Sequence, residues 1–137
     1  MIRPESRRRA RALQLLCARE ACPQQGDDAA YRGLARLVGP EPGILEEARQ
    51  LADGVAVRQG ELDRLAQAAA DNWRLDRIAM VERNILRLGV AELLVGVTPP
   101  KVVLDESIWL AQRFAGPRAP GFVNGVLDRV ARSLGRL

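Results

Sequence analysis

The residues best suited to chemistry in this sequence are a run of arginines close to its beginning. Arg7, Arg8, Arg9 and Arg11 precede or open the first expected helix. A guanidinium group is always charged, and its fork of N–H donors suits phosphate oxygens. The run is therefore a candidate phosphate-binding element of a nucleic-acid interface. On composition alone, a solvated charged tail is an equally good interpretation.

Positive charge is concentrated at the two ends of the chain. Residues 1–19 carry six arginines and one acid, whereas residues 20–97 carry nine arginines and thirteen acids. Residues 98–137 again carry six basic groups against three acids, and the formal net charge is +4. If the two ends lie together in the fold, they form one basic patch, and such patches attract nucleic acid.

An aromatic residue flanked by arginines marks the C-terminal third of the chain. Phe122 lies about 100° from the centre of the apolar stripe of the last expected helix, on the same flank as Arg129. Arg118 stands in the loop just before that helix. This arrangement can stack a nucleobase while the arginines neutralise its phosphates. The alternative is that Phe122 is a residue at the edge of the core.

Trp109 is a second aromatic in an unusual position. It shares a helix face with Asp105 and Arg113, opposite Phe114. A large aromatic on a polar face suggests contact with a partner protein. The alternative is a tryptophan that lies under a loop or against a neighbouring helix.

Catalysis has little support in this sequence. There is no histidine, which removes the commonest general base and metal ligand. No glycine-rich phosphate loop and no GxSxG motif is present. Cys17 and Cys22 stand five residues apart, a spacing that fits neither a zinc site nor a redox motif. We expect no enzyme, no metal and no cofactor.

The length of 137 residues suits one compact domain. The beginning of the chain lacks the apolar segment of a signal peptide, and no stretch is long enough to span a bilayer. We therefore expect a soluble, cytoplasmic protein that does not associate with membranes.

Apolar periodicity and breaker residues predict an all-α fold. No alternation typical of strands is present, and no repeat or low-complexity linker divides the chain. The segment 75–95 is apolar on most sides, so we expect it at the centre of the bundle. The expected helices cover residues 8–21, 29–38, 44–70, 75–95 and 101–115, and a last helix begins near residue 120.

The second half of the chain carries three motifs in a specific order. They are NWRLDRIAMVERNILRLGVAELL (72–94), PPKVVLDESIWLAQRFAG (99–116) and FVNGVLDRV (122–130). Together with the RRRAR and LQLL of the first helix, these motifs closely resemble the NusB family. The resemblance implies an all-α fold of two three-helix subdomains, about 1–70 and about 71–137, in a single NusB-like domain.

The resemblance also implies partners. NusB proteins pair with NusE, a ribosomal protein, and the pair binds the boxA element of nascent RNA. They support antitermination on ribosomal RNA operons within an RNA polymerase complex. The resemblance and the residue patterns together give Glu82 and Trp109 as protein-binding residues, and leave open whether the chain forms a homodimer. The residues expected to face RNA are Arg7, Arg8, Arg9, Arg11, Arg118, Phe122, Asn124 and Arg129.

Two other classes of function stay open at this point. The same domain occurs at the N-terminus of a ribosomal RNA cytosine methyltransferase, an interpretation that needs a methyl-donor domain after Leu137. A helical scaffold that binds only proteins, or itself, is the other alternative. Salt-sensitive RNA binding separates a scaffold from an RNA-binding factor.

Overall fold

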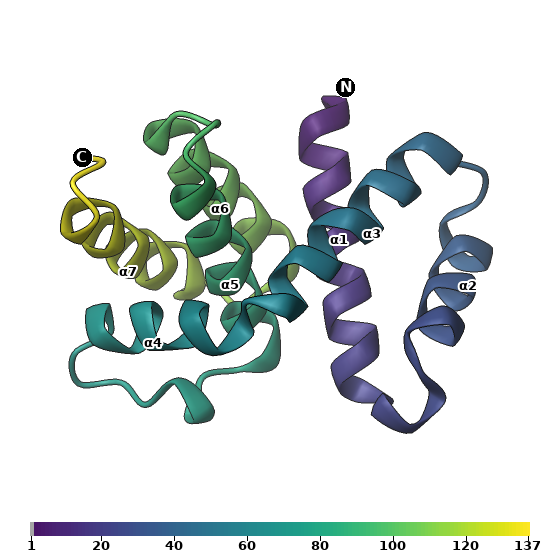
Figure 1. Cartoon of the computed structure of the whole chain (residues 1–137), viewed down its shortest axis with the longest axis horizontal. Coiled ribbons are helices and arrows are strands. Elements are labelled where there is room, and N and C mark those ends of the chain that lie inside the picture. The colour runs from purple at the N-terminus through teal and green to yellow at the C-terminus, as the bar shows by residue number, and fades with distance from the viewer. Residues whose placement is uncertain (1) are drawn as a thin grey trace. The chain divides into compact units, whose positions relative to one another are not determined.

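A computed structural model describes residues 2–137 and contains only helices and connecting segments in that range. The all-α prediction is therefore confirmed. The chain divides into two compact units, the first ending at Gly54 and the second running from Val55 to Leu137 (Figure 1). The motifs of the sequence predict a division near residue 70, whereas the division between Gly54 and Val55 falls within a helix. None of the described helices is both long and apolar enough to cross a membrane.

The first unit is formed by α1 (Pro4–Ala21), α2 (Asp27–Val38) and most of α3 (Pro42–Val57), with a short 3-10 helix, η1 (Pro23–Gln25). α1 begins four residues earlier than expected, because Pro4 occupies the first-turn position that proline favours. Charged pairs join these helices: Arg19 Nη2 lies 2.7 Å from Asp53 Oδ1, linking α1 to α3. The Arg49 guanidinium of α3 lies 4.6 Å from the ring centroid of Tyr31 in α2.

The single helix expected over residues 44–70 is wrong, because the structure breaks it into two. α3 ends at Val57 and α4 (Gln59–Ala69) begins two residues later. Between them Arg58 adopts φ −107° and ψ 12°, outside the helical region. Gly54 and Gly60 flank this point, and glycine disfavours a helix interior by about 1 kcal/mol relative to alanine. The chain therefore leaves the helix where its local propensity is weakest.

The second unit is a bundle of α4, α5 (Met80–Val95), α6 (Pro100–Phe114) and α7 (Ala119–Ser133) (Figure 1). α5 contacts all three of the other helices. Within residues 2–137 it holds the longest unbroken run of buried residues, 84–90, as its central position requires. The buried apolar residues of α5 are Ile85, Leu86, Leu88, Val90 and Leu93.

The helix expected to start at residue 75 starts later. Leu75–Arg77 form a 3-10 turn, η2, and Ile78 and Ala79 are extended before α5 begins at Met80. Arg83 Nη1 donates a hydrogen bond to the Ile78 carbonyl at 2.7 Å, which satisfies an acceptor left free by the extended segment. The extended segment lets Leu75 and Ile78 both be buried.

A glycine allows the helices of the bundle to approach closely. A Cβ atom placed on Gly89 in α5 would lie 2.7 Å from Leu127 Cδ1 and 3.1 Å from Ser107 Oγ. Leu127 belongs to α7 and Ser107 to α6, and both are buried. The three central helices therefore meet at a position where a side chain has no room.

The bundle also contains a partly buried ion pair between α4 and α5, in which the Asp63 side chain is 28% exposed. Arg87 of α5 is 8% exposed, and its Nε and Nη2 lie 2.7 and 3.0 Å from the two carboxylate oxygens of Asp63 in α4. Its Nη1 donates to Asn84 Oδ1 at 3.1 Å. The periodicity of residues 75–95 suggests almost no polar face, and this network is the exception.

Candidate nucleic-acid interface

Three of the four arginines of the N-terminal run lie on α1 with acidic neighbours in their own unit. Arg11 Nε donates to Glu41 Oε1 at 2.9 Å, and Arg7 Nη1 lies 3.8 Å from Glu41 Oε2. Arg8 pairs with Glu47 of α3. All three arginines are partly exposed. They form a surface, the α1 arginine surface (Arg7, Arg8 and Arg11), whose charge is partly balanced by two carboxylates.

Glu41 is the acid that pairs with two arginines of this surface, Arg7 and Arg11. The hydrogen bond from Arg11 holds the pKa of Glu41 below its usual value, and the charges of Arg11 and Arg7 act in the same direction against the opposing effect of burial. Glu41 is therefore ionised at neutral pH. A phosphate group that approaches Arg11 must compete with this carboxylate.

Arg9 does not share the surface of its neighbours. It is 6% exposed and lies on the buried face of α1 with Leu13 and Leu16, four and seven residues further on. Its side chain has interactions within the protein. The assignment of Arg9 to RNA stays a prediction, and its burial does not favour that role. The spacing of four and seven residues places Arg9, Leu13 and Leu16 on one face of the helix. This pattern could have distinguished Arg9 from the other three arginines of the run.

The second unit brings Phe122 against an aromatic residue that sequence analysis missed. The Phe122 ring, on α7, meets the Trp73 ring edge to face, with centroids 5.6 Å apart and planes inclined by 69°. Phe122 is half-buried, and Trp73 is 61% exposed. Trp73 stands in the polar stretch DNWR between α4 and η2. A lone tryptophan in a polar stretch is the feature of the sequence that could have identified it as a candidate binding residue.

Arg129 reaches the same connecting segment from α7. Its Nη1 donates to the Ala69 carbonyl at 3.0 Å and lies 3.0 Å from Asp71 Oδ2. Phe122 and Arg129 are therefore brought to one short segment, residues 69–73, as their shared flank on the helix predicts. We call Trp73, Phe122 and Arg129 the aromatic corner.

Two further residues expected at RNA are exposed. Arg118 is the N-cap residue of α7, and Asn124 lies within that helix. Neither side chain has a hydrogen bond or ion pair with any part of the chain that the structure describes. Both are free to meet a ligand without first losing an internal partner.

The two residues expected at a protein partner differ in their surroundings. Glu82 is half-buried in the first turn of α5, and its carboxylate has no ion pair or hydrogen bond within residues 2–137. Trp109 is half-buried on α6, with the Arg113 guanidinium 5.3 Å from its ring centroid. Trp109 is therefore partly covered by a residue of its own helix rather than fully presented to solvent.

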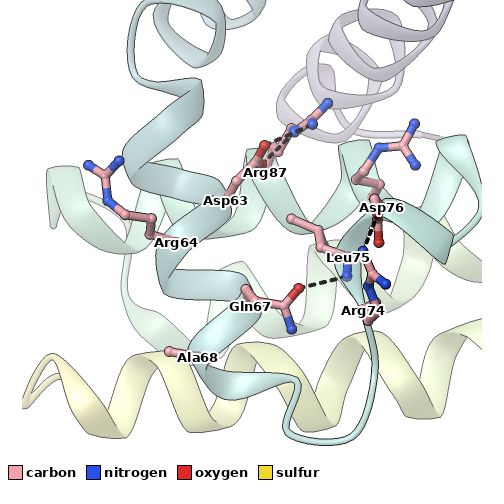
Figure 2. Close-up of a pocket in the computed structure, with 9 residues that line it drawn as sticks. Asp63, Arg64, Gln67, Ala68, Arg74, Leu75, Asp76 and Arg87 are labelled. Carbon is pink, nitrogen blue, oxygen red and sulfur yellow. Dashed lines mark hydrogen bonds and ion pairs between the residues drawn. The ribbon is translucent and has the colours of Figure 1, made fainter.

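A pocket of about 800 Å³ opens beside α4, η2 and α5 (Figure 2). Its charged groups are mostly paired with one another: Arg87 with Asp63, and Arg74 with Asp76 at 3.0 Å. Among the described residues, no group of three or more histidines, cysteines and acids could hold a metal ion. The pocket is lined by Asp63, Arg64, Gln67, Ala68, Arg74, Leu75, Asp76, Arg83 and Arg87.

Comparison with known sequences identifies relatives of the whole chain. The family model described as "NusB family" matches residues 6–132. The transcription antitermination protein NusB of Anaeromyxobacter dehalogenans is 41% identical over 129 residues, covering 94% of this chain and 91% of that protein. The protein of the same name from Sorangium cellulosum is 43% identical over 134 residues, covering 94% and 92%.

Solved structures agree with these matches. T. maritima NusB superimposes with a TM-score of 0.82 at 29% identity, covering 96% of this chain and 93% of that one. A chain from the crystal structure of the antitermination factors NusB and NusE in complex with double-stranded RNA gives a TM-score of 0.82 at 27% identity, covering 97% and 99%. On this match of sequence and fold over nearly its full length, the chain belongs to the NusB family.

Proposed function

We propose that this chain is a transcription antitermination factor. It binds boxA-type single-stranded RNA together with NusE, a small-subunit ribosomal protein, and supports transcription of ribosomal RNA within an RNA polymerase antitermination complex. It acts by binding rather than by catalysis, in the cytoplasm where transcription takes place. The observation that carries the proposal is the fit of nearly the whole chain to the fold of a protein solved with NusE and RNA.

The proposed RNA contacts are of two physical kinds. The α1 arginine surface supplies charge, and RNA phosphates would replace Glu41 and Glu47 as partners of its guanidinium groups. Because one anion replaces another, this exchange limits the net gain from each arginine. Phe122 supplies a ring that can stack on an unpaired base, an interaction without an ionic component.

These two kinds of interaction predict different salt dependence. An Arg8→Gln change should weaken binding to boxA-type and unrelated RNA alike, and should flatten the log–log salt slope by about 0.7 for each phosphate that is no longer neutralised. Phe122→Ala should lower RNA affinity about tenfold or more and leave the slope nearly unchanged. The measurement is RNA affinity across a salt series, with circular dichroism to verify folding.

Arg36→Gln is the matched control, because it removes the same charge from an exposed position on α2 outside the proposed surface. It should leave both affinity and slope near those of the unmodified chain. The phosphate role of Arg8 is wrong if the salt slope of the Arg8→Gln variant equals that of Arg36→Gln. The stacking role of Phe122 is wrong if its alanine variant binds RNA normally, or if the change unfolds α7.

A charge reversal at Glu82 addresses the protein partner. Because this carboxylate has no partner among the described residues, Glu82→Lys should leave the unfolding midpoint nearly unchanged. It should weaken association with NusE through poorer charge complementarity, chiefly by slowing association. Surface plasmon resonance measures both rates, and Glu46→Lys, on an exposed part of α3, is the control for the charge change. Normal NusE binding combined with a large loss of stability would assign Glu82 to the fold instead.

A further inference from the structure

Trp73 is an aromatic residue that the fold leaves open to solvent. It is 61% exposed, and among residues 2–137 it is the only aromatic residue in the exposed class. A tryptophan carries a large apolar surface that folding normally buries. Its exposure here needs a reason other than packing of the core.

The backbone around Trp73 is held in place from both sides. Its N–H donates to the Ala70 carbonyl at 3.1 Å, and its own carbonyl accepts from Gln67 Nε2 at 2.6 Å. The same Gln67 amide accepts the Leu75 N–H at 2.8 Å, a bond visible in Figure 2. Gln67 thus clamps residues 73–75 onto α4. The backbone that carries the ring is therefore already ordered before a ligand binds, which lowers the entropy cost of binding.

The surroundings of the ring select the kind of ligand. Phe122 meets Trp73 edge to face, so the two rings form a corner rather than a closed stack. Arg129 is fixed at Ala69 and Asp71, on the N-terminal side of Trp73. Arg74, the next residue, pairs with Asp76 at 3.0 Å and lines the neighbouring pocket. Two flat rings with a guanidinium group held beside their segment suit an unpaired base and an adjacent phosphate.

We propose that Trp73 completes the aromatic corner as the stacking surface for one unpaired nucleobase of single-stranded RNA. Phe122 borders that base, and Arg129 meets a phosphate next to it. This inference rests on the proposed function, because it presupposes that the chain binds RNA. It adds to that function a base-binding residue that lies in a loop rather than on the basic helix or on α7.

Two variants separate stacking from packing. Trp73→Leu keeps an apolar side chain but removes the aromatic face, whereas Trp73→Phe keeps a smaller face. We expect Trp73→Leu to lower affinity for a boxA-type oligonucleotide about tenfold or more, and Trp73→Phe to restore most of that loss. Thermal unfolding of both variants checks the fold. If Trp73 serves only packing, affinity follows stability, and the inference is overturned.

An abasic scan of the RNA identifies the base directly. Oligonucleotides that each lack one base are titrated against the unmodified chain and Trp73→Leu. If Trp73 stacks on a base, the loss of one particular base should weaken RNA binding by the unmodified chain. The same abasic position should have little further effect on RNA binding by Trp73→Leu. The Phe122→Ala variant should show the same insensitivity at that position. Additive effects of Trp73→Leu and every abasic position would overturn the inference.

Tryptophan emission provides a readout independent of affinity. The chain has two tryptophans, Trp73 and Trp109, so RNA binding should quench the emission of the unmodified chain but not that of Trp73→Phe. Equal quenching in both proteins contradicts stacking on Trp73. If Trp73→Leu binds RNA normally but binds NusE more weakly, this surface contacts a protein. That result would overturn the inference about Trp73 and leave the proposed function standing. An unmodified chain that binds no RNA would instead refute the proposed function.

Discussion

Replacing Asp63 with alanine should lower the free energy of unfolding by about 1.5–3 kcal/mol, because it removes two charge-assisted hydrogen bonds from the largely buried Arg87 guanidinium. Both carboxylate oxygens of Asp63 bind Arg87, whose side chain is 9% exposed. Asn84 Oδ1 accepts a hydrogen bond from Nη1 of the same guanidinium at 3.1 Å, and the variant leaves this bond in place. Chemical denaturation monitored by circular dichroism measures the change.

The matched control for this ion pair lies at the same pocket. Asp76 pairs with Arg74 at 3.0 Å, but both side chains are about two thirds exposed. Exposed pairs of this kind contribute about 0–1 kcal/mol, so Asp76→Ala should leave stability nearly unchanged. If the two aspartate variants lose equal stability, the Asp63–Arg87 pair does not have the importance that the burial of Arg87 implies.

Ile85→Ala should lower the free energy of unfolding by about 2–5 kcal/mol. Ile85 is fully buried in α5, the helix that contacts the other three helices of its unit. Removing its side chain reduces apolar burial and leaves a cavity that tightly packed neighbours cannot fill. Val97→Ala, at a residue that is 84% exposed, should change stability by less than about 0.5 kcal/mol. An unchanged unfolding midpoint for Ile85→Ala would show that α5 is not the core of its unit.

The helices of this fold were predictable because their signals are local. Apolar spacing predicted the central helix, and Pro100 and the Asp71–Asn72 break fell at or beside helix ends. The interruption at Arg58 was missed, because two glycines weaken a helix without fixing where it breaks. Local propensity therefore gave the elements, and tertiary packing decided their exact limits.

The candidate site was only partly predictable, because its pairings are not local. Phe122 and Arg129 were found from helical spacing, but their meeting with residues 69–73 depends on how α7 packs beside α4. The bond between Asp63 and Arg87 joins residues that are 24 positions apart. No period in the sequence links such positions. Trp73 was missed for the same reason, since its importance depends on the ring it faces.

The carboxylates beside α1 also modify the electrostatic interpretation of the sequence. A count of charges suggests that the arginine run is free to bind polyanions, whereas Glu41 and Glu47 already pair with three of its members and partly balance their charge. Affinity for RNA then depends on exchange of one anion for another. This arrangement favours a specific partner over general attraction to polyanions, in accord with an added role for base stacking.

The measurement that tests the account most directly is an RNA titration with and without NusE. The purified chain is titrated against a boxA-type oligonucleotide and a scrambled oligonucleotide of equal length and composition, at two or more salt concentrations. The account predicts tighter binding to the boxA-type RNA, a larger preference when NusE is present, and affinity that falls as salt rises. Equal affinity for both RNAs in the presence of NusE, or the absence of salt-sensitive binding to either, would contradict it.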